Sequence, residues 1–489
     1  MKNLNRRKFI QSTAVASAGA LFATRWSAFA AESSVIGAND EIRIAVIGFR
    51  GRGKDHISGI NKLREKGHKV RITALCDVDS DVLARGAAEF EKRGEKVETY
   101  VDTRDLLESK NVDAVTIATP NHWHALGAIW AIQAGKDVYL EKPVSHNVWE
   151  GRQIVNAARK YKKIVQTGTQ SRSSHAIRDA VKWVQEGNLG KIVISRGLCY
   201  KPRNSIGNVV GPQPVPSSID YDLWLGPAEM TDLTRKDLHY DWHWVWATGN
   251  GDLGNQGIHQ MDIARWFLGE MELSPRVWSV GGRLGYIDDG ETANTQIIYH
   301  DYAKAPLIFE VRGLPEKKGS KAMDKFMGGS VAVIVHCEGG HVVIPNYHSA
   351  TAYDKDGKEL KKWNGADDHY ENWIKAVRSR KVEDLTADIL EGHLSSALCH
   401  TGNISHRIGG PANDRQIREA IRADVGGLET YERMLAHLNA NEVDLAETPL
   451  TLGADLQMNP AKERFTNNKF ANEFLTRKYR KPFVVPARI

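Results

Sequence analysis

One short stretch constrains the fold more than any other, a strand that runs directly into a glycine-rich turn. Residues 42–47 (IRIAVI) are apolar except for Arg43, which is typical of a strand covered on both faces. The turn that follows reads Gly48-Phe49-Arg50-Gly51-Arg52-Gly53, and a helical stretch comes after it. Glycines in such a turn permit a tight bend and a close approach of a ligand to the backbone. The order of strand, glycine turn and helix predicts the start of a parallel βαβ unit.

The same alternation continues along the N-terminal third of the chain. Further apolar runs lie at 70–76, 113–118, 137–140 and 164–167, with helical stretches between them. Parallel strands need such helical crossovers, and open parallel sheets bind ligands at the carboxyl ends of their strands. Residues 41–170 are therefore predicted to form a Rossmann domain, which makes the overall class α/β.

The pattern changes near Gly190. After a helical stretch at 256–268, short strand-like runs dominate and further helices follow. Strands clustered in this way favour an α+β domain with an open, mostly antiparallel sheet, which we expect over 171–410. The strand-like runs lie at 191–200, 276–285, 292–299, 306–311, 331–337 and 341–345. The C-terminal extension, 411–489, is polar, and we expect it to pack along the surface.

The glycine turn predicts a dinucleotide site. The pyrophosphate of a dinucleotide binds at a helix N-terminus, where free N–H groups and the helix dipole favour anions. Gly48 and Gly53 hold the outer positions of the usual GxGxxG pattern, whereas Arg50 takes the middle one beside Gly51. The residues expected to contact the cofactor here are Gly48, Phe49, Arg50, Gly51, Arg52 and Gly53.

Asp77 stands at the end of the second predicted strand, 24 residues after Gly53. A carboxylate at this position accepts hydrogen bonds from the ribose hydroxyls of NAD and repels the additional phosphate of NADP. NAD is therefore the expected cofactor. NADP stays open because Arg50 or Arg52 can serve a phosphate, and Asp77 has a second interpretation as a cap of the following helix.

Polar residues follow the next two strands. One strand ends in Thr119-Pro120-Asn121-His122-Trp123-His124, and its neighbour ends in Glu141-Lys142-Pro143. The proline biases Lys142 away from helical angles and keeps it extended at the strand tip. Both ends fall on the edge of the sheet where open α/β folds bind ligands.

These two motifs, with the alanine-rich segment 128–136 between them, resemble the glucose–fructose oxidoreductase and inositol dehydrogenase (Gfo/Idh/MocA) family. The resemblance covers residues 41 to about 410. It implies that the second domain binds substrate on an open sheet that often mediates oligomers, so a homo-oligomer is expected. It also implies that Lys142 lies beside the nicotinamide and the substrate hydroxyl. The cofactor-binding residues expected from these motifs are Thr119, Asn121, His124, Glu141 and Lys142.

A second element similar to the family is the run GDLGNQGIHQMD, which ends at Asp262. The usual form has an aspartate four residues before the histidine, whereas this chain has Asn255, which forms hydrogen bonds but cannot act as a base. Residues four apart share one face of a helix, so Asn255 and His259 are expected to reach the same ligand. His259 has a free pKa near neutrality and can take a proton from a hydroxyl, while Asp262 either orients that imidazole or faces solvent. Lys142 and His259 are therefore the predicted catalytic residues.

Residues 240–246 (YDWHWVW) carry a tryptophan at every second position. In an extended segment these rings would line one face, where aromatic rings stack on sugars and a histidine binds hydroxyls; packing in the core is the alternative interpretation. Arg172 falls where the family often has polar residues near the site. The predicted substrate-binding residues are Arg172, Trp242, His243, Trp244, Asn255 and His259.

Residues 1–31 are typical of an export signal. Residues 5–10 (NRRKFI) precede an apolar run at 12–23, and the small residues at 28–30 (AFA) suit a cleavage site. The adjacent arginines resemble the twin-arginine class, with a plain secretory signal as the alternative. The run is shorter than the roughly 20 residues that span a bilayer, so no stable membrane insertion is expected once the signal is removed. We expect a periplasmic protein, exported folded, with tightly bound NAD.

Charge and cysteine content exclude other classes of protein. The net charge is +6, from 66 basic and 60 acidic residues, and no basic block combines with aromatic residues as it does in nucleic-acid-binding proteins. The 4 cysteines stand far apart and form no CxxC pair, which argues against a disulfide framework and a metal site. Neither a nucleic-acid partner nor a metal is expected.

Three functions stay open. The first is an NAD(P)-dependent dehydrogenase that oxidises a ring hydroxyl of a sugar or glycoside to a ketone, at C3. The second, suggested by the resemblance, is a glycoside hydrolase that oxidises C3, eliminates the aglycone, adds water and reduces again, so that NAD is recycled. The third is a non-catalytic binding protein that retains NAD, and the presence of Lys142 and His259 argues against it.

Overall fold

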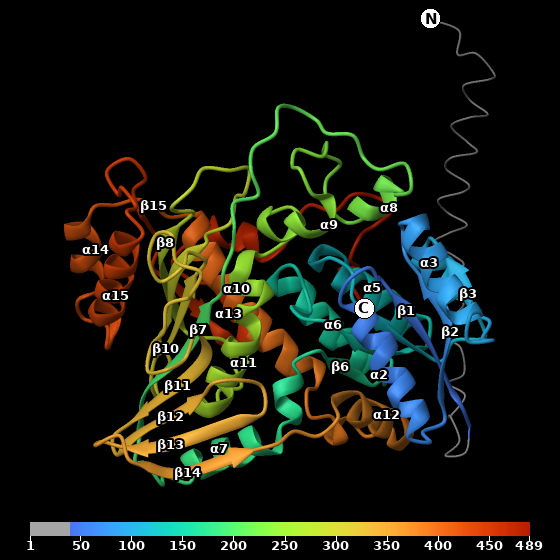
Figure 1. The fold of residues 1–489 in the computed structure, drawn as a ribbon, viewed down its shortest axis with the longest axis horizontal. Coiled ribbons are helices and arrows are strands. Elements are labelled where there is room, and N and C mark those ends of the chain that lie inside the picture. Colours follow the sequence, from blue (N-terminus) through green and yellow to red (C-terminus); the bar gives the residue numbers. More distant parts are fainter. Residues whose placement is uncertain (1–39) are drawn as a thin grey trace, which may run out of the picture.

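The N-terminal domain is built on a sheet of six parallel strands in the order β3-β2-β1-β4-β5-β6 (Figure 1). The structure, a computed structural model, describes residues 40–489, so the predicted export signal lies outside the described residues. The strands are β1 (Ile42–Ile47), β2 (Val70–Cys76), β3 (Glu98–Tyr100), β4 (Ala114–Ile117), β5 (Asp137–Leu140) and β6 (Val165–Thr167). The strand order reverses between β1 and β4, and a crevice at such a switch point is where open α/β sheets bind ligands. The predicted Rossmann sheet is confirmed.

Helices cover both faces of this sheet because its strands are apolar on both sides. They are α2 (Gly53–Glu65), α3 (Ser80–Glu91), α4 (Thr103–Leu107), α5 (Asn121–Gln133), α6 (Val148–Lys160) and α12 (His369–Ser379). The core on one face contains side chains of α4, α5 and α6, and the core on the other contains those of α2, α3 and α12. Trp373 of α12 is fully buried there. A helix from the stretch predicted to form the second domain therefore completes the core of the first.

The second domain contains a large mixed sheet in which neighbouring strands are antiparallel except for β7 and β10. Its main strands are β7 (Ile192–Tyr200), β8 (Arg276–Gly282), β9 (Thr295–His300), β10 (Leu307–Arg312), β11 (Val331–Cys337), β12 (Gly340–Ile344), β13 (Ser349–Asp354) and β14 (Glu359–Asn364). The predicted mostly antiparallel sheet is confirmed. Strands β13 and β14 were not predicted. β14 is an edge strand with the sequence ELKKWN and has no buried residue, and the buried residues of β13 are only Ala350, Thr351 and Ala352, which form no run of large apolar side chains.

Three helices pack on the inner face of this sheet, which faces the first domain. They are α7 (His175–Gln185), α11 (Gly257–Leu268) and α13 (Ile389–Arg407). The short α10 (Gly251–Asn255) precedes α11 and ends where the two domains meet. This layer of helices thus places the run 251–262 (GDLGNQGIHQMD) beside the edge of the parallel sheet.

The C-terminal extension packs more deeply than the sequence predicts. Helices α14 (Asp414–Ile421) and α15 (Gly427–Ala440) place buried apolar side chains against the outer face of the mixed sheet. The chain then crosses the molecule, and its C-terminus lies beside the first domain (Figure 1). Phe483 and Val485 are buried in the core that contains Trp123. The expectation of mere surface packing was wrong because these apolar residues are few and widely spaced, so composition alone hides them.

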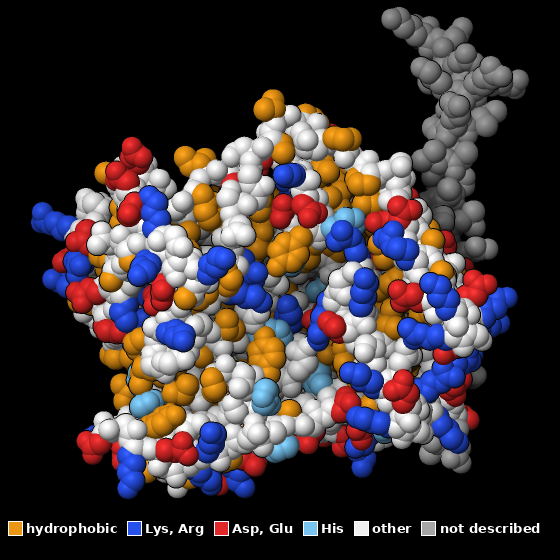
Figure 2. Space-filling view, in the orientation of Figure 1, with side chains coloured by type: hydrophobic (Ala, Val, Ile, Leu, Met, Phe, Trp, Pro, Cys, Tyr) orange, Lys and Arg blue, Asp and Glu red, His pale blue; other side chains and the backbone are white. Residues whose placement is uncertain are grey.

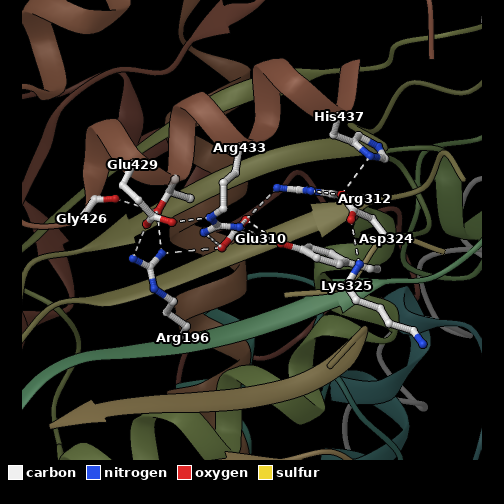
Figure 3. A network of polar contacts seen from close by, with 11 residues as sticks. Arg196, Glu310, Arg312, Asp324, Lys325, Gly426, Glu429, Arg433 and His437 are labelled. Carbon is white, nitrogen blue, oxygen red and sulfur yellow. Dashed lines mark hydrogen bonds and ion pairs between the residues drawn. The ribbon is translucent and has the colours of Figure 1, made fainter. Parts of the chain in front are cut away.

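A network of ion pairs fixes α15 to the outer face of the sheet (Figure 3). The carboxylate of Glu310 on β10 accepts hydrogen bonds from both terminal nitrogens of Arg433, at 2.6 and 2.9 Å, and from the Tyr200 hydroxyl at 2.7 Å. Arg312 donates to the same carboxylate at 3.3 Å. Arg196 of β7 reaches Glu429 of α15 at 2.6 Å and lies 3.7 Å from Glu310. Burial opposes the ionisation of Glu310, yet the surrounding arginines hold its pKa below the usual value.

Candidate active site

A cavity of about 420 Å³ lies at the carboxyl ends of β1 and β4 and reaches into the second domain. The first domain contributes the glycine turn, Asp77 and the ends of β4 and β5. The second contributes Lys201, the segment 239–243 and the end of α10. Figure 2 shows a hollow near the middle of this face with basic side chains around it. Two domains therefore enclose one site at the switch point of the parallel sheet.

The glycine turn has the shape of a pyrophosphate cradle. Gly48 has a φ of +74°, and a Cβ there would lie 2.9 Å from the backbone nitrogen of Thr119. A Cβ on Gly53, where α2 begins, would lie 2.2 Å from the Gly48 carbonyl oxygen. A Cβ on Gly51 would meet nothing within 4 Å, so the turn is open at this point. The glycines let the turn pack tightly against β4 while leaving room for a ligand at the helix N-terminus.

Asp77 is fastened to the same turn. Its carboxylate accepts hydrogen bonds from the backbone N–H groups of Phe49, at 3.0 Å, and Asp79, at 3.1 Å. Asp79, not Asp77, caps α3, so the alternative interpretation of Asp77 as a helix cap was wrong. Burial raises the pKa of Asp77 to about 6. The carboxylate lines the cavity and can still accept hydroxyl donors when it is ionised.

The motif after β4 lines the cavity and joins it to neighbouring loops. The hydroxyl of Thr119 is buried and has no hydrogen-bond partner among residues 40–489, so it can serve a ligand. Asn121 donates to the side chain of Asn250 at 3.0 Å. The ring nitrogens of His124 lie 2.6 Å from the Pro143 carbonyl oxygen and 2.8 Å from that of Thr119. His124 therefore holds the ends of β4 and β5 together.

Glu141 ties the glycine turn to the end of β5. Its carboxylate accepts a hydrogen bond from Arg52 Nε at 2.8 Å and lies 3.1 Å from His56 Nε2. Burial opposes ionisation, but the bond to His56 and the charge of Arg52 hold the pKa of Glu141 well below its usual range. The sequence analysis missed His56; its only signal was a histidine at a buried position of α2. Because Arg52 is engaged here, it is less suited to serve the extra phosphate of NADP.

Lys142 is half-buried between the two domains. Its ammonium group donates to the backbone carbonyl of Asn255 at 2.9 Å, and both residues line the cavity. Burial lowers the pKa of Lys142, and the charges of Arg52 and Lys201 lower it further against the opposing effect of Glu141. The sequence predicted a side-chain role for Asn255, whereas the structure shows that its carbonyl positions the lysine.

His259 lies on α11 and does not line the cavity itself, unlike Lys142 and Asn255. It is 6% exposed, its ring lies 4.9 Å from that of Tyr347, and its Nδ1 has no partner among the described residues. Burial and the charge of Lys142 lower the pKa of His259 to about 3. The imidazole is therefore neutral near pH 7, and it is a weaker base than the free pKa used in the sequence analysis predicts.

Asp262 and Arg172 form a buried ion pair outside the cavity. Arg172 donates to both oxygens of Asp262, at 2.8 and 2.9 Å, and both side chains are buried. Arg172 also lies 3.1 Å from Glu391 and does not line the cavity. Asp262 therefore neither orients His259 nor faces solvent, and Arg172 does not bind substrate, so both predictions were wrong. The pair instead joins the loop after β6 to the helices of the second domain.

The tryptophan-rich segment is not extended. Leu238–Asp241 form the helical turn α9 and Trp242–Trp244 a 3₁₀ turn, so residues two apart no longer share a face. Trp242 and His243 line the cavity with their rings stacked at 3.6 Å. Trp244 is buried under Arg203, at 5.2 Å, and does not line the cavity. The predicted aromatic face is therefore wrong for Trp244 and is replaced by the Trp242–His243 stack.

A glycine turn at the switch point of a parallel sheet, with a half-buried lysine at a neighbouring strand end, is typical of oxidoreductases with a dinucleotide-binding Rossmann fold. Residues 42–169 match the model of the oxidoreductase family with an NAD-binding Rossmann fold, and residues 173–426 match the model of its C-terminal alpha/beta domain. The chain belongs to the Gfo/Idh/MocA oxidoreductase family.

Several curated relatives share part of the chain. A "Glycosyl hydrolase family 109 protein" of a Shewanella species is 31% identical over an alignment of 181 residues, with a coverage of 33% of this chain and 39% of the relative. "Inositol 2-dehydrogenase 1" of Saccharopolyspora erythraea is 30% identical over 154 residues, or 31% and 44% of the two chains. The matches thus span less than half of the length of these relatives.

Two solved structures share the fold. Levoglucosan dehydrogenase in complex with NADH has a TM-score of 0.56 at 16% identity, covering 74% of this chain and 95% of that chain. The WlbA dehydrogenase of Bordetella pertussis, in complex with NADH and UDP-GlcNAcA, has a TM-score of 0.54 at 19% identity, covering 73% and 94%. At these identities, both comparisons show a shared fold.

Proposed function

We propose that the protein oxidises a ring hydroxyl of a sugar or glycoside, at C3, with NAD as the hydride acceptor. The observation that carries this proposal is Lys142, a half-buried lysine of lowered pKa that lines the cavity between the glycine turn and the second domain. The Trp242–His243 stack supplies an aromatic wall of the kind that packs on sugar rings. The names of two relatives, an inositol dehydrogenase and a levoglucosan dehydrogenase, support a polyhydroxylated substrate.

Different residues of the cavity would bind the cofactor and transfer the proton. The turn Gly48–Gly53, Asp77 and Thr119 would hold the cofactor, and NAD, when bound, supplies the hydride acceptor. Neutral Lys142 takes the hydroxyl proton on Nζ while the C–H bond of the same carbon breaks, which converts the alcohol to a ketone. His259 is neutral but does not line the cavity, so its support for the site is indirect, through its contact with Tyr347. The backbone carbonyl of Asn255 accepts a hydrogen bond from Lys142 and so holds the lysine where the second domain borders the cavity.

A glycoside hydrolase that begins with the same oxidation is the second candidate. A C3 ketone acidifies the hydrogen at C2, so elimination of the aglycone, addition of water and reduction of the ketone can follow without net redox change. The family 109 hydrolases among the relatives favour this candidate. A non-catalytic NAD-binding protein is the third, but it gives no reason for a half-buried lysine of lowered pKa in the cavity.

Labelled glycosides test the proposal. Deuterium at C3 is expected to transfer to NAD and to slow a single turnover, because the C3–H bond breaks in the first step. Deuterium at C2 is expected to matter only if elimination follows. Mass spectrometry then separates the candidates, since a dehydrogenase gives a product two hydrogens lighter and a hydrolase releases free sugar. If the C3 label neither reaches the cofactor nor slows the reaction, oxidation at C3 is refuted.

We propose that the mature protein works in the periplasm as a homo-oligomer with retained cofactor, and residues 1–31 are the basis for the location. Within residues 40–489, none of the helices combines the length and the hydropathy that a membrane span requires. Free NAD is scarce outside the cytoplasm. A cofactor that is loaded before export and recycled in place would make the enzyme independent of the outside supply.

The protein is expected to purify with NAD(H) and to lose it as the pH falls. Asp77 has a pKa of about 6, and only its ionised form accepts both ribose hydroxyls, so cofactor affinity should increase as the pH rises through 6. Dialysis at pH 5 and pH 8, followed by assay of the denatured supernatant, measures this. Asp77→Asn should retain little NAD at either pH. Equal retention by the wild type at both pH values, or recovery of NADP(H) alone, would overturn the role of Asp77.

A further inference from the structure

Two lysines that line the cavity beside the second domain have no carboxylate in direct contact among the residues that the structure describes. Lys142 donates to the Asn255 carbonyl at 2.9 Å, and Lys201, at the end of β7, donates to the side-chain oxygen of Gln256 at 2.8 Å. Among residues 40–489, no carboxylate oxygen lies within 4.0 Å of either ammonium group. Their hydrogen-bond acceptors are neutral amide oxygens.

The carboxylates that act electrostatically on Lys142 already have partners. Glu141 is held by Arg52 and His56. Asp252, fully buried at the start of α10, accepts two hydrogen bonds from Arg203, at 2.6 and 2.9 Å. An arginine paired in this bidentate way largely offsets the charge of its carboxylate. Lys201 therefore leaves this part of the cavity with a positive charge that no carboxylate among residues 40–489 pairs with directly.

Lys201 lies on the substrate side of the site. Its partner Gln256 donates to the Tyr347 hydroxyl at 2.7 Å, and the ring of Tyr347 lies 4.9 Å from that of His259. These residues belong to the second domain, whereas the pyrophosphate cradle belongs to the first. The contacts of Lys201 thus lead toward the predicted catalytic histidine and away from the glycine turn.

We infer that the substrate is an anionic sugar and that Lys201 binds its charged group, a carboxylate or a sulfate ester. The inference rests on the proposed function, because it assumes that a sugar occupies this cavity. An ammonium group pairs with either anion through charge-assisted hydrogen bonds, and partial burial strengthens the pair. The side-chain amide of Asn255, which also lines the cavity, can donate to a remaining anion oxygen.

Calorimetry with the cofactor-loaded protein tests the inference. The probes are methyl glucoside, methyl glucuronide and methyl glucoside 6-sulfate. We expect at least one anionic probe to bind about tenfold or more tightly than the neutral one, a difference of about 1.4 kcal/mol. Lys201→Gln should reduce the ratio of the two affinities to near one, and Lys201→Arg should restore it. Lys182→Gln, the same change at an exposed lysine of α7, should keep the wild-type ratio.

The pattern of results identifies the anion or overturns the inference. Preference for the glucuronide alone or for the sulfate alone supports the site and names its ligand. Equal affinities in the wild type, or an unchanged preference in Lys201→Gln, would overturn it. Loss of NAD from Lys201→Gln would also overturn it, because the lysine would then serve the cofactor. Tight binding of an anionic sugar without keto product or free sugar would instead refute the proposed oxidation alone.

Discussion

Lys142→Ala is expected to lower turnover at least about a hundredfold, the scale on which a positioned base acts. The reason is geometric, because Lys142 combines a lowered pKa with a place at the junction of the cofactor cradle and the second domain. Cofactor content should stay near that of the wild type, since the glycine turn and Asp77 are untouched. Single-turnover absorbance of NADH, with bound NAD(H) measured after denaturation, gives both quantities.

The pH dependence distinguishes a base from a merely structural lysine. Burial lowers the pKa of Lys142 from 10.5, and only the neutral amine accepts a proton, so the rate should rise with pH and level off above an inflection below 10.5. Lys142→Arg keeps the charge but stays protonated, so it should be about as slow as Lys142→Ala. Lys182→Ala is the matched control. Undiminished turnover by Lys142→Ala would mean that the site lies elsewhere.

Glu310→Gln is expected to lower the free energy of unfolding by about 3 kcal/mol, which is typical when one member of a buried ionic network is removed. The substitution keeps the shape of the side chain but leaves the buried charges of Arg196, Arg312 and Arg433 without their common counterion (Figure 3). The helix α15 should detach from the sheet most easily. Urea denaturation followed by circular dichroism measures the change.

The control for this prediction is an exposed ion pair of the same kind. Glu442 pairs with Lys318 at 2.5 Å, but the two side chains are 67% and 66% exposed. Such a surface pair contributes at most about 1 kcal/mol, so Glu442→Gln should be close to the wild type. A Glu310→Gln protein as stable as Glu442→Gln would show that the network does not hold α15.

The sequence by itself determined the parallel sheet and the cofactor end of the site. The period and apolarity of β1, β2, β4 and β5 are local properties, and residues at the carboxyl ends of parallel strands must meet at one edge. For this reason the glycine turn, Asp77 and Lys142 could be placed in one cavity before the fold was known. The same reasoning predicted the mostly antiparallel second sheet, apart from its strands β13 and β14.

Only the tertiary structure decided which polar residues face the substrate. Arg172 and Asp262 are 90 residues apart and pair with each other because the loop after β6 packs on α11. His56 meets Glu141 across 85 residues, and the turn at 242–244 removes Trp244 from the cavity while keeping Trp242. The burial and partner of a polar side chain depend on segments that pack against it, and no local pattern encodes that packing. The sequence therefore predicts where a site can form, whereas packing selects the side chains that complete it.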